Sequence, residues 1–280
     1  MLDKADMISG DQEVDARKLT QARIRNLREL YKKGGIGPVL GQILRHIRNW
    51  THRKKYYRFV KGLDGRSPAT IFSEIYNRKL WVSDESRSGF GSELAYTENL
   101  RKSLPVLLER FGIRTIVDAP CGDFNWMRLV PLTAGMSYMG VDIVPELIEV
   151  NQSRYGDEQH RFVVADILQK PLASADILIC RDCLFHFSDL DIIRALRNFV
   201  DSNTPFLLTS TYLSQDGFIN TDINTGEFRL LDLFSAPFCL PQDVLYRIDD
   251  FIPPHPPRQM CLWSRDQVRF ALQKLSLHDR

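Results

Sequence analysis

The stretch TIVDAPCGDFNWM, residues 115–127, has the form of an apolar strand that ends on an aspartate and runs directly into a turn. A short apolar strand, an acidic residue and a glycine-containing turn are typical of the first βα unit of a nucleotide-binding sheet. Such turns usually carry several glycines, but this one keeps only Gly122, with Pro120 before it and Phe124 after it. The stretch therefore predicts a cofactor loop of unusual composition.

After residue 114, short apolar segments alternate with helical patterns. This alternation predicts βαβ units and a mostly parallel, doubly wound α/β sheet. We expect strands at 115–119, 137–143, 161–167, 175–181 and 205–212, and helices at 125–133, 145–154 and 189–201. Before the sheet, helices are expected at 69–82 and 98–110, and two last strands, 244–251 and 258–265, flank the proline-rich FIPPHPP and favour an antiparallel pair at the sheet edge.

The composition is that of a globular protein, with 44% hydrophobic and 26% charged residues in 280. No apolar run approaches the ~20 residues that span a bilayer. The acidic, polar N-terminus does not have the pattern of a secretory signal. Five scattered cysteines, an odd number, are typical of a reducing compartment. The composition therefore predicts a cytoplasmic protein.

Charge is distributed unevenly along the chain. Residues 17–66 contain 15 Lys/Arg and two Asp/Glu, a balance of +13, whereas the rest of the chain has a balance of −11. Such asymmetry can indicate an anionic partner. We expect a disordered leader at 1–16, a basic amphipathic helical segment at 17–66, an α/β domain at 67–265 and a helix or tail at 266–280.

The segment IGPVLGQILRHIRNW, residues 36–50, has the i, i+3, i+4, i+7 apolar spacing of one helical face. The basic HRKKYYR, residues 52–58, follows it. One interpretation is peripheral contact of residues 36–58 with an anionic membrane at its inner face, with Trp50 at the headgroup level. The other is a helix that packs its apolar face on the protein's own core, which we favour because most amphipathic helices do so.

Three aspartates are expected at the ends of the first three strands: Asp118, Asp142 and Asp166. In a doubly wound sheet, ligands bind just outside these strand ends. Asp142 lies 24 residues after Asp118, where an acidic residue accepts hydrogen bonds from both ribose hydroxyls of an adenosine cofactor. Three aspartates at consecutive strand ends favour a cofactor site over isolated helix caps or turns.

At residues 70–265 the sequence resembles the class I S-adenosylmethionine-dependent methyltransferases. The segments that carry the resemblance are TIVDAPCGDF, SYMGVDIVPELIEVNQ, RFVVADIL and ADILICRDCLFHFS. With WVSDESRSGFGS, NTDINTGEFR and CLW, they are similar to a bacterial subgroup that shares the DAPCGDFNWM motif and has no assigned substrate. The resemblance implies a Rossmann-like seven-stranded sheet, whose last two strands form a reversed hairpin, with an N-terminal helical segment.

The resemblance also implies the cofactor S-adenosylmethionine and the residues that bind it. Asp118 and Gly122 would lie at the methionine part, and Asp142 with Ile143 at the ribose. Asp166 and Ile167 would lie beside the adenine. The segment after the fourth strand, which begins with Arg181, would open onto the transferred methyl group.

The first motif departs from the family's pattern. The usual turn is acidic-x-Gly-x-Gly-x-Gly, and here Pro120 and Phe124 replace the first and third glycines. We expect Phe124 and Trp126 to form a wall of the pocket instead. Cofactor binding does not depend on the missing glycines, because the essential contacts come from backbone groups and acidic side chains.

His186 is the candidate catalytic residue, five positions after Arg181. Neutral histidine is suited to act as a base toward a hydroxyl near neutral pH, and Asp182 could orient His186 or a substrate donor. The alternative is that His186 is a helix-terminal or core residue. Cys180 and Cys183 form a C-x-x-C with no second pair, which favours a structural role over a metal or redox one.

Two loops are candidates for further contacts. Residues 83–93 precede the first strand and, by the resemblance, fold over the cofactor, so that Ser88, Ser92 or Thr97 could bind it; a flexible loop with a helix cap is the alternative. The polar insertion after the fifth strand is a candidate part of the acceptor site. Its candidate residues are Asn220, Asp222, Thr225 and Arg229, of which Arg229 could bind a carboxylate or phosphate as a fork.

These observations favour a methyltransferase acting on a small polar acceptor, either a hydroxyl of a saccharide or that of another metabolite. A nucleic-acid methyltransferase with residues 17–66 as a basic arm is an alternative. It is weakened because no RNA-binding module is recognisable and the rest of the chain is acidic. A membrane-associated binding module with a catalytically silent methyltransferase-like fold is the other alternative, suggested by the missing glycines.

Overall fold

The structure is a computed structural model, and it describes residues 55–214, 217–253 and 255–278. The chain divides into two compact units, Met1–Phe59 and Val60–Arg280. The expected leader at 1–16 and the amphipathic helix at 36–50 lie outside the described residues. The fold below is that of the second unit.

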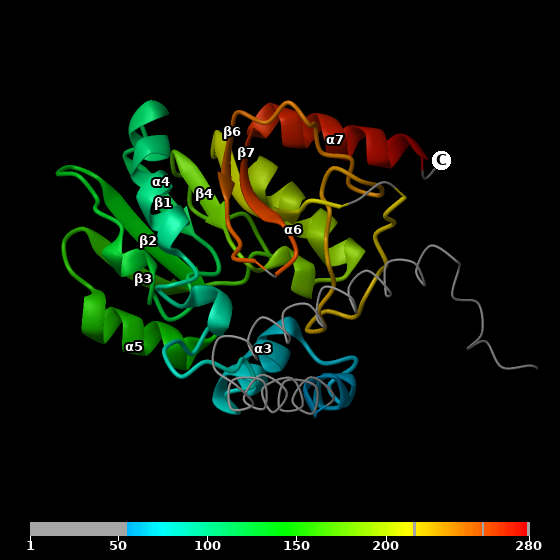
Figure 1. Cartoon of the computed structure of the whole chain (residues 1–280), viewed down its shortest axis with the longest axis horizontal. Helices are drawn as coiled ribbons and strands as arrows, with labels where there is room; N and C mark the ends of the chain where they lie inside the picture. Colours follow the sequence, from blue (N-terminus) through cyan, green and yellow to red (C-terminus); the bar gives the residue numbers. More distant parts are fainter. Residues whose placement is uncertain (1–54, 215–216, 254, 279–280) are drawn as a thin grey trace, which may run out of the picture. The chain divides into compact units, whose positions relative to one another are not determined.

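Within the described residues, seven strands form one sheet in the order β3-β2-β1-β4-β5-β7-β6 (Figure 1). The strands are β1 Thr115–Asp118, β2 Ser137–Asp142, β3 His160–Val164, β4 Ile177–Cys180, β5 Phe206–Tyr212, β6 Tyr246–Asp249 and β7 Arg258–Ser264. Neighbours from β3 to β5 are parallel, and β7 runs antiparallel to both β5 and β6. The predicted Rossmann-like sheet with a reversed final hairpin is confirmed.

Helices flank the sheet and supply much of its packing. They are α3 Pro68–Asn77, α4 Glu98–Arg110, α5 Pro145–Tyr155, α6 Asp189–Asp201 and α7 Arg265–His278. α4 contacts β6, α5 contacts β2 and β3, and α6 packs against α7 (Figure 1). The side of α4 that carries four leucines is buried, as its i, i+4, i+7, i+8 spacing predicts. None of the helices in the described part of the chain is both long and apolar enough to cross a membrane.

The strand order reverses at β1 and β4, which lie side by side although β2 and β3 follow β1 in the chain. Loops from the two strands diverge at such a point and leave room for a ligand outside the carboxyl ends. Because β7 is antiparallel, its first residue lies at the edge where the parallel strands end, and Arg258 is paired with Tyr212 at the end of β5. One edge therefore gathers the ends of six strands and the beginning of the seventh.

Three of the predicted elements differ from the structure. The helix expected at 125–133 is only a 3-10 turn, Met127–Leu129, because Phe124 before it has a left-handed backbone with φ of 58° and Pro131 follows soon after. The helix expected at 69–82 ends at Asn77. The strand expected at 161–167 ends at Val164, which leaves Asp166 in the following turn.

Candidate active site

Asp118 ends β1 and is almost fully buried. Its carboxylate accepts a hydrogen bond from the Tyr138 hydroxyl at 2.7 Å. Burial raises the pKa of Asp118 to about 7, while the Tyr138 hydrogen bond and the charge of Arg181 act in the opposite direction. This carboxyl can accept further hydrogen bonds. A ligand that donates them or carries a positive charge would stabilise its charged form.

Asp142 ends β2 and is also buried. One carboxylate oxygen accepts from the Gly122 amide at 3.2 Å and the other from the Val144 amide at 3.1 Å. Burial raises the pKa of Asp142 to about 6, although these backbone hydrogen bonds favour the charged form. A carboxylate has about four lone-pair positions, so two oxygens with one internal bond each can still accept from two ribose hydroxyls.

Gly122 allows the loop of residues 83–93 to approach the first motif closely. Its φ is 56°, and a Cβ there would lie 2.4 Å from the Ser88 hydroxyl oxygen. No side chain fits at that separation, and non-glycine residues disfavour this backbone conformation. Ser88 thus occupies the open face of Gly122 that sequence analysis reserved for the methionine part of the cofactor.

Asp123 holds the same loop in place. Its carboxylate accepts from the Ser86 hydroxyl at 3.0 Å, from the Arg87 amide at 2.7 Å and from the Ser88 hydroxyl at 3.2 Å. In return, the Asp123 amide donates to Ser88 Oγ at 2.9 Å. The loop of residues 83–93 is therefore bonded to the cofactor loop, and the Ser88 hydroxyl, a candidate contact to the cofactor or a substrate oxygen, is bonded to Asp123.

Phe124 lies beneath the loop, in contrast to the expected pocket wall. It is buried, and its ring packs against the rings of Tyr138, Tyr155, His160 and Phe162 at centroid distances of 5.0–5.7 Å. These residues come from β2, β3 and α5. Phe124 thus anchors the loop to the core, where a glycine would leave that space unfilled.

Asp166 and Ile167 follow β3 in a turn. The Asp166 carboxylate accepts from the Leu168 amide at 2.8 Å, an Asx-type turn, and the Ile167 carbonyl accepts from Asn198 Nδ2 at 2.8 Å. Ile143 follows Asp142 at the end of β2. The predicted adenine-side residues therefore lie at the same sheet edge as Asp118 and Asp142, with Asp166 two residues beyond its strand.

Arg181 follows β4 and belongs to a buried ion network. Its guanidinium bonds both carboxylate oxygens of Asp250, at 2.9 and 3.0 Å, and donates to the Gly91 carbonyl at 2.8 Å. Asp250 also accepts from Arg258 at 2.8 Å. Although burial opposes it, the charges of Arg181 and Arg258 lower the pKa of Asp250. Arg181 was predicted to bind cofactor, and the structure places its guanidinium in these contacts.

Asp182 bonds to the other side of this network. Its carboxylate lies 2.5 Å from Arg258 Nη1 and 3.5 Å from Arg181 Nη1, and its amide donates to Ser210 Oγ at 3.0 Å. The backbone of Asp182 is left-handed, with φ of 54°. Backbone strain of this kind persists where the surroundings hold it and is concentrated at functional sites.

His186 closes a 3-10 turn, Leu184–His186, before α6. Its Nδ1 lies 2.8 Å from the Glu227 carbonyl oxygen, which requires a proton on Nδ1 and leaves Nε2 as an acceptor. Burial lowers the pKa of His186, so the ring is neutral near pH 7. The predicted orienting role of Asp182 is corrected, because the Glu227 carbonyl makes that contact, while Asp182 contributes only its charge at a distance.

The polar side chains of the insertion serve the fold. Arg229 is buried, forms an ion pair with Asp189 at 2.6 Å and donates to the Thr221 and Phe187 carbonyls. Asn220, Asp222 and Thr225 likewise bond to protein groups: the Asp232 backbone, the Asp189 amide, and Asp191 with Ser188. The expectation that these four residues bind the acceptor is therefore not supported by their contacts.

The remaining predicted polar residues have structural contacts as well. Thr97 Oγ1 donates to the Glu93 carbonyl and makes no side-chain cap bond to α4, and the Ser92 carbonyl accepts from Asn125 Nδ2. Cys180 and Cys183 are both buried free thiols. Among the described residues, no group of three or more His, Cys, Asp or Glu is arranged to hold a metal ion.

Sequence reasoning missed four residues of the site. Asp250 and Arg258 complete the ion network, Asp123 holds the loop, and Asn151 donates to the Gly122 carbonyl at 2.7 Å. Asp123 had a local signal, since an aspartate after a glycine in a turn commonly bonds nearby backbone. Nothing in the local sequence connects Asp250 or Arg258 to Arg181.

Comparisons with known proteins agree with this geometry. Residues 117–201 match a family described as a methyltransferase domain, and this range runs from β1 to the end of α6. No curated protein sequence matches the chain. The matched range contains the ends of β1, β2 and β4, which carry Asp118, Asp142 and the segment before His186.

Several solved structures share the fold at low identity. Magnesium protoporphyrin IX methyltransferase (ChlM) from Synechocystis PCC 6803, with bound S-adenosylmethionine, has a TM-score of 0.52 and 15% identity over 72% of this chain and 99% of its own. Mitomycin 7-O-methyltransferase MmcR has a TM-score of 0.54 and 17% identity, covering 78% of this chain and 68% of its own. Human N-acetylserotonin methyltransferase, in complex with S-adenosylmethionine, has a TM-score of 0.50 and 16% identity, covering 77% and 66%.

The matched domain and the fold support an enzyme of the S-adenosylmethionine-dependent methyltransferase class. Two of these solved structures, ChlM and the human enzyme, hold S-adenosylmethionine. The carboxylates of Asp118 and Asp142 fit that cofactor, because each is buried at a strand end and keeps acceptor capacity.

Proposed function

We propose that the enzyme transfers a methyl group to a hydroxyl oxygen of a small polar acceptor, a saccharide or another hydroxylated metabolite, with His186 as the general base. The observation that carries the proposal is the 2.8 Å contact between His186 Nδ1 and the Glu227 carbonyl. It leaves Nε2 unprotonated, directly after the end of β4. A hydroxyl is a poor nucleophile until its proton is accepted, and a fixed imidazole is suited to accept it.

On this proposal the cofactor lies along the ends of β1 and β2. Asp142 would hold the ribose hydroxyls with Ile143 beside it, Asp118 would hold the methionine part, and Asp166 and Ile167 would lie toward the adenine. When bound, S-adenosylmethionine supplies a methyl group on a sulfonium, and its carbon–sulfur bond breaks as the acceptor oxygen bonds to that carbon. Positioning provides much of the rate because the methyl carbon is already activated.

The surroundings of His186 suit a single proton transfer. The rings of Trp81, Phe185 and Phe228 lie at 6.0, 4.9 and 5.8 Å from the imidazole. They cover much of the imidazole, and this burial lowers its pKa and keeps it neutral before the reaction. Trp81 Nε1 is buried and has no hydrogen-bond partner among the described residues, so the neighbourhood retains a donor for an acceptor oxygen. Asp182 supports the protonated imidazole only through its charge, which favours the cationic form.

The choice of a hydroxyl acceptor rests on His186 and on the polar groups at the ends of β4 and β5. The solved structures give wider context, since MmcR is named as an O-methyltransferase. The bacterial subgroup that shares the DAPCGDFNWM motif stays a prediction, as does contact of residues 36–58 with a membrane. A silent binding module would show no turnover with any acceptor, which separates it from the proposal.

The test is a pair of substitutions at one position. His186→Asn keeps a donor toward the Glu227 carbonyl but has no basic nitrogen, whereas His186→Ala removes both. Screening hydroxylated metabolites and glycans with isotopically labelled methyl donor identifies the acceptor on the wild-type enzyme. We expect both variants to lower kcat by about 10²–10⁴-fold, the usual contribution of a general base.

Calorimetry with S-adenosylhomocysteine supplies the control for this test. We expect its affinity for both variants to stay within about twofold of wild type, because His186 contacts no cofactor-side residue. Equal losses of turnover and cofactor affinity would show a structural role for His186 and overturn the base assignment.

A further inference from the structure

Six residues gather around the end of β4 and the start of β7: Phe90, Tyr96, Asp182, Tyr212, His255 and Arg258, here called the acceptor-side cluster. We propose that the acceptor-side cluster is a binding subsite for an uncharged, hydroxyl-bearing ring, a neutral saccharide unit. The proposal rests on the proposed function. It adds the residues that select the methyl acceptor and the requirement that this acceptor is uncharged.

The charges around the acceptor-side cluster balance one another. Two guanidinium groups, of Arg181 and Arg258, face two carboxylates, of Asp182 and Asp250, within 3.5 Å. Each arginine contacts both carboxylates, so the formal charge of the group is zero. A charged ligand would either stay unpaired beside this network or break one of its buried pairs, and both are unfavourable.

The four charged side chains of this network differ in their exposure to solvent. The side chains of Arg181, Arg258 and Asp250 are 3%, 4% and 0% exposed, whereas that of Asp182 is 23% exposed. Asp182 is therefore the part of this network that a ligand can reach. It presents carboxylate oxygens, which accept hydrogen bonds from hydroxyls, while its charge is already balanced by Arg258.

The position of Asp182 is fixed by its neighbours. Its left-handed backbone is held by the Ser210 hydroxyl, and a Cβ on Gly91 would lie 2.7 Å from its Oδ2. Gly91 thus has to lack a side chain for the loop of residues 83–93 to lie against this carboxylate. A carboxylate oxygen held in one position imposes one orientation on the ligand hydroxyl that donates a hydrogen bond to it.

Two phenols complete the polar part of the subsite. The guanidinium of Arg258 lies 5.4 Å from the Tyr96 ring centroid and 5.9 Å from that of Tyr212. Asp182 is near enough to raise the pKa of both phenols, in addition to the larger effect of their burial. Each phenol therefore keeps its proton and can donate to an oxygen of a ligand, and the Tyr212 oxygen also accepts from the Arg258 guanidinium.

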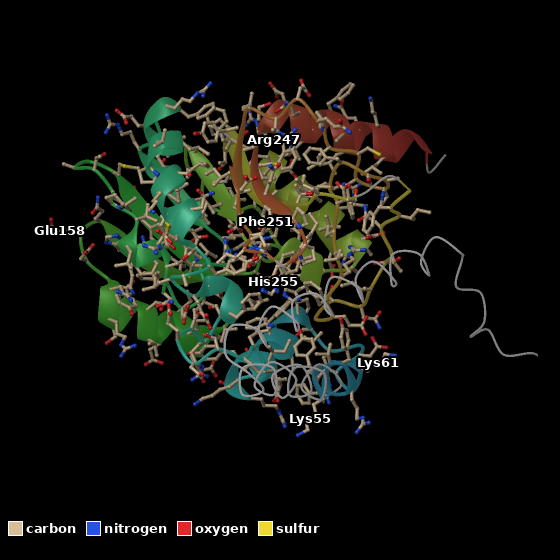
Figure 2. All side chains as sticks on the ribbon, viewed as in Figure 1. Lys55, Lys61, Glu158, Arg247, Phe251 and His255 are labelled. Carbon is tan, nitrogen blue, oxygen red and sulfur yellow. The ribbon has the colours of Figure 1, made fainter. Side chains whose placement is uncertain are left out.

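Aromatic rings form the rim. Phe90 is 45% exposed, and its ring lies 4.8 Å from the His255 ring and 5.1 Å from the Tyr96 ring. Figure 2 shows His255 in the connection between β6 and β7. Burial and the charge of Arg258 lower the pKa of His255, so this ring is neutral as well. Flat apolar faces beside hydroxyl-binding groups suit a saccharide ring, which has apolar C–H faces and polar edges.

The acceptor-side cluster adjoins the proposed base. Tyr212 packs on Phe185 at 5.8 Å, and Phe185 packs on His186 at 4.9 Å. Asp182 is four positions before His186 and favours its protonated form. A ring bonded to Asp182 and the phenols would thus present another of its hydroxyls toward His186.

The probe is a panel of methyl glycosides, observed by saturation-transfer NMR on the full-length protein with S-adenosylhomocysteine present. The panel contains neutral glycosides of glucose, galactose, mannose, rhamnose and fucose, one anionic glucuronide and one cationic glucosaminide. We expect at least one neutral glycoside to bind the wild type, and its signal to fall at least fivefold in both Asp182→Asn and Tyr96→Phe. Tyr246→Phe and Asp243→Asn lie away from the acceptor-side cluster and should leave that signal unchanged.

Tyr96→Phe removes a hydroxyl without touching any ion pair, so it tests the subsite even if Asp182→Asn unfolds. The inference is overturned if no neutral glycoside binds, if the charged glycosides bind better than the neutral ones, or if the variants bind as the wild type does. Calorimetry with S-adenosylhomocysteine is scored separately. Cofactor binding without glycoside binding refutes the subsite alone, whereas Tyr96-dependent glycoside binding without cofactor binding refutes the proposed methyl transfer alone.

Discussion

The carboxyl edge of the sheet has two halves, and aspartates lie in opposite environments in the two. In the cofactor half, at the ends of β1 and β2, Asp118 and Asp142 are buried and bonded to a phenol or to backbone amides, and burial raises the pKa of each. In the acceptor half, Asp182 and Asp250 are paired with Arg181 and Arg258, and the pKa of Asp250 is lowered.

The difference shows what each half lacks. Among the described residues, the carboxyls of the cofactor half form no ion pair, and Arg181 acts on Asp118 only through its charge, so a ligand that donates hydrogen bonds or carries an amine would stabilise their charged form. The acceptor half is neutral within itself and held by arginine forks, so on the proposal above it would select its ligand by hydrogen-bond geometry. In one half of the edge the aspartates would gain a charged or donating partner from a ligand. In the other half they already have arginine partners.

The largest effect is expected from breaking the acceptor half. Arg258→Met leaves Asp250 with one guanidinium and Asp182 with a single partner at 3.5 Å, so the free energy of unfolding should fall by about 3–5 kcal/mol. Urea denaturation at pH 7 measures it. Arg247→Met removes an exposed arginine from the neighbouring strand β6 and should cost less than about 1 kcal/mol. Equal losses in the two variants would remove the distinction between the halves.

The next effect concerns cofactor affinity. Asp142→Asn removes a charged acceptor of two ribose hydroxyls, and S-adenosylhomocysteine should bind about 10²-fold more weakly, since each hydrogen bond to a charged group contributes about 1.5–3 kcal/mol. In the wild type, affinity should fall as the pH drops below about 6, where Asp142 becomes protonated. Calorimetry from pH 5 to 8 should show this slope for the wild type and for Asp201→Asn, and a shallower slope for Asp142→Asn, in which Asp118 still titrates within that range.

A smaller effect is expected on the pH dependence of stability. The pKa of Asp118 is about 7 in the folded protein and near 3.8 in the unfolded chain, so the folded state binds the extra proton between those values. Stability contributed through Asp118 is therefore present at low pH and is lost as the pH rises toward 7. Asp118→Asn should remove that loss, on the order of 1–3 kcal/mol between pH 5 and 8. A constant offset from wild type at all pH values would contradict it.

The smallest effect tests the loop that joins the halves. Gly122→Ala places a Cβ 2.4 Å from Ser88 Oγ on a backbone with φ of 56°, and should cost about 1–2 kcal/mol through the left-handed conformation, plus the clash. Ser88→Gly in the same chain should recover the part due to the clash. A double-mutant cycle by urea denaturation measures this coupling, and strictly additive losses would show that Ser88 has moved away without cost.

Most of the fold could be predicted because it depends on local pattern. Apolar strands of four to seven residues alternate with helices, and the strand order follows from the βαβ handedness and the resemblance. Asp118 and Asp142 were placed correctly because each directly follows an apolar run. The helix expected at 125–133 failed because the left-handed conformation of Phe124 depends on an aromatic cluster drawn from three other elements.

Less of the site could be predicted, because its polar residues bond to partners that are far away in the sequence. Arg229 and Arg181 were both recognised as cations near a functional edge, but no local signal indicates Asp189 or Asp250 as their partners. His186 follows the fourth strand, as expected, yet the group that contacts its Nδ1 is a backbone carbonyl in the insertion. Every residue has a backbone carbonyl, so the sequence does not indicate which one orients a histidine. The structure shows that the Glu227 carbonyl, and not Asp182, contacts His186 Nδ1.

The ion network also bears on how the chain assembles. Tyr138 and Asp118 are 20 residues apart, as are Gly122 and Asp142, whereas Arg181 is 69 residues before Asp250 and 90 after Gly91. Closing a longer loop costs more chain entropy, and contacts of high sequence separation are slow to form. During synthesis from the N-terminus, Arg181 leaves the ribosome well before Asp250 exists. The cofactor half can therefore acquire its contacts first, and the acceptor half closes only when the last third of the chain arrives.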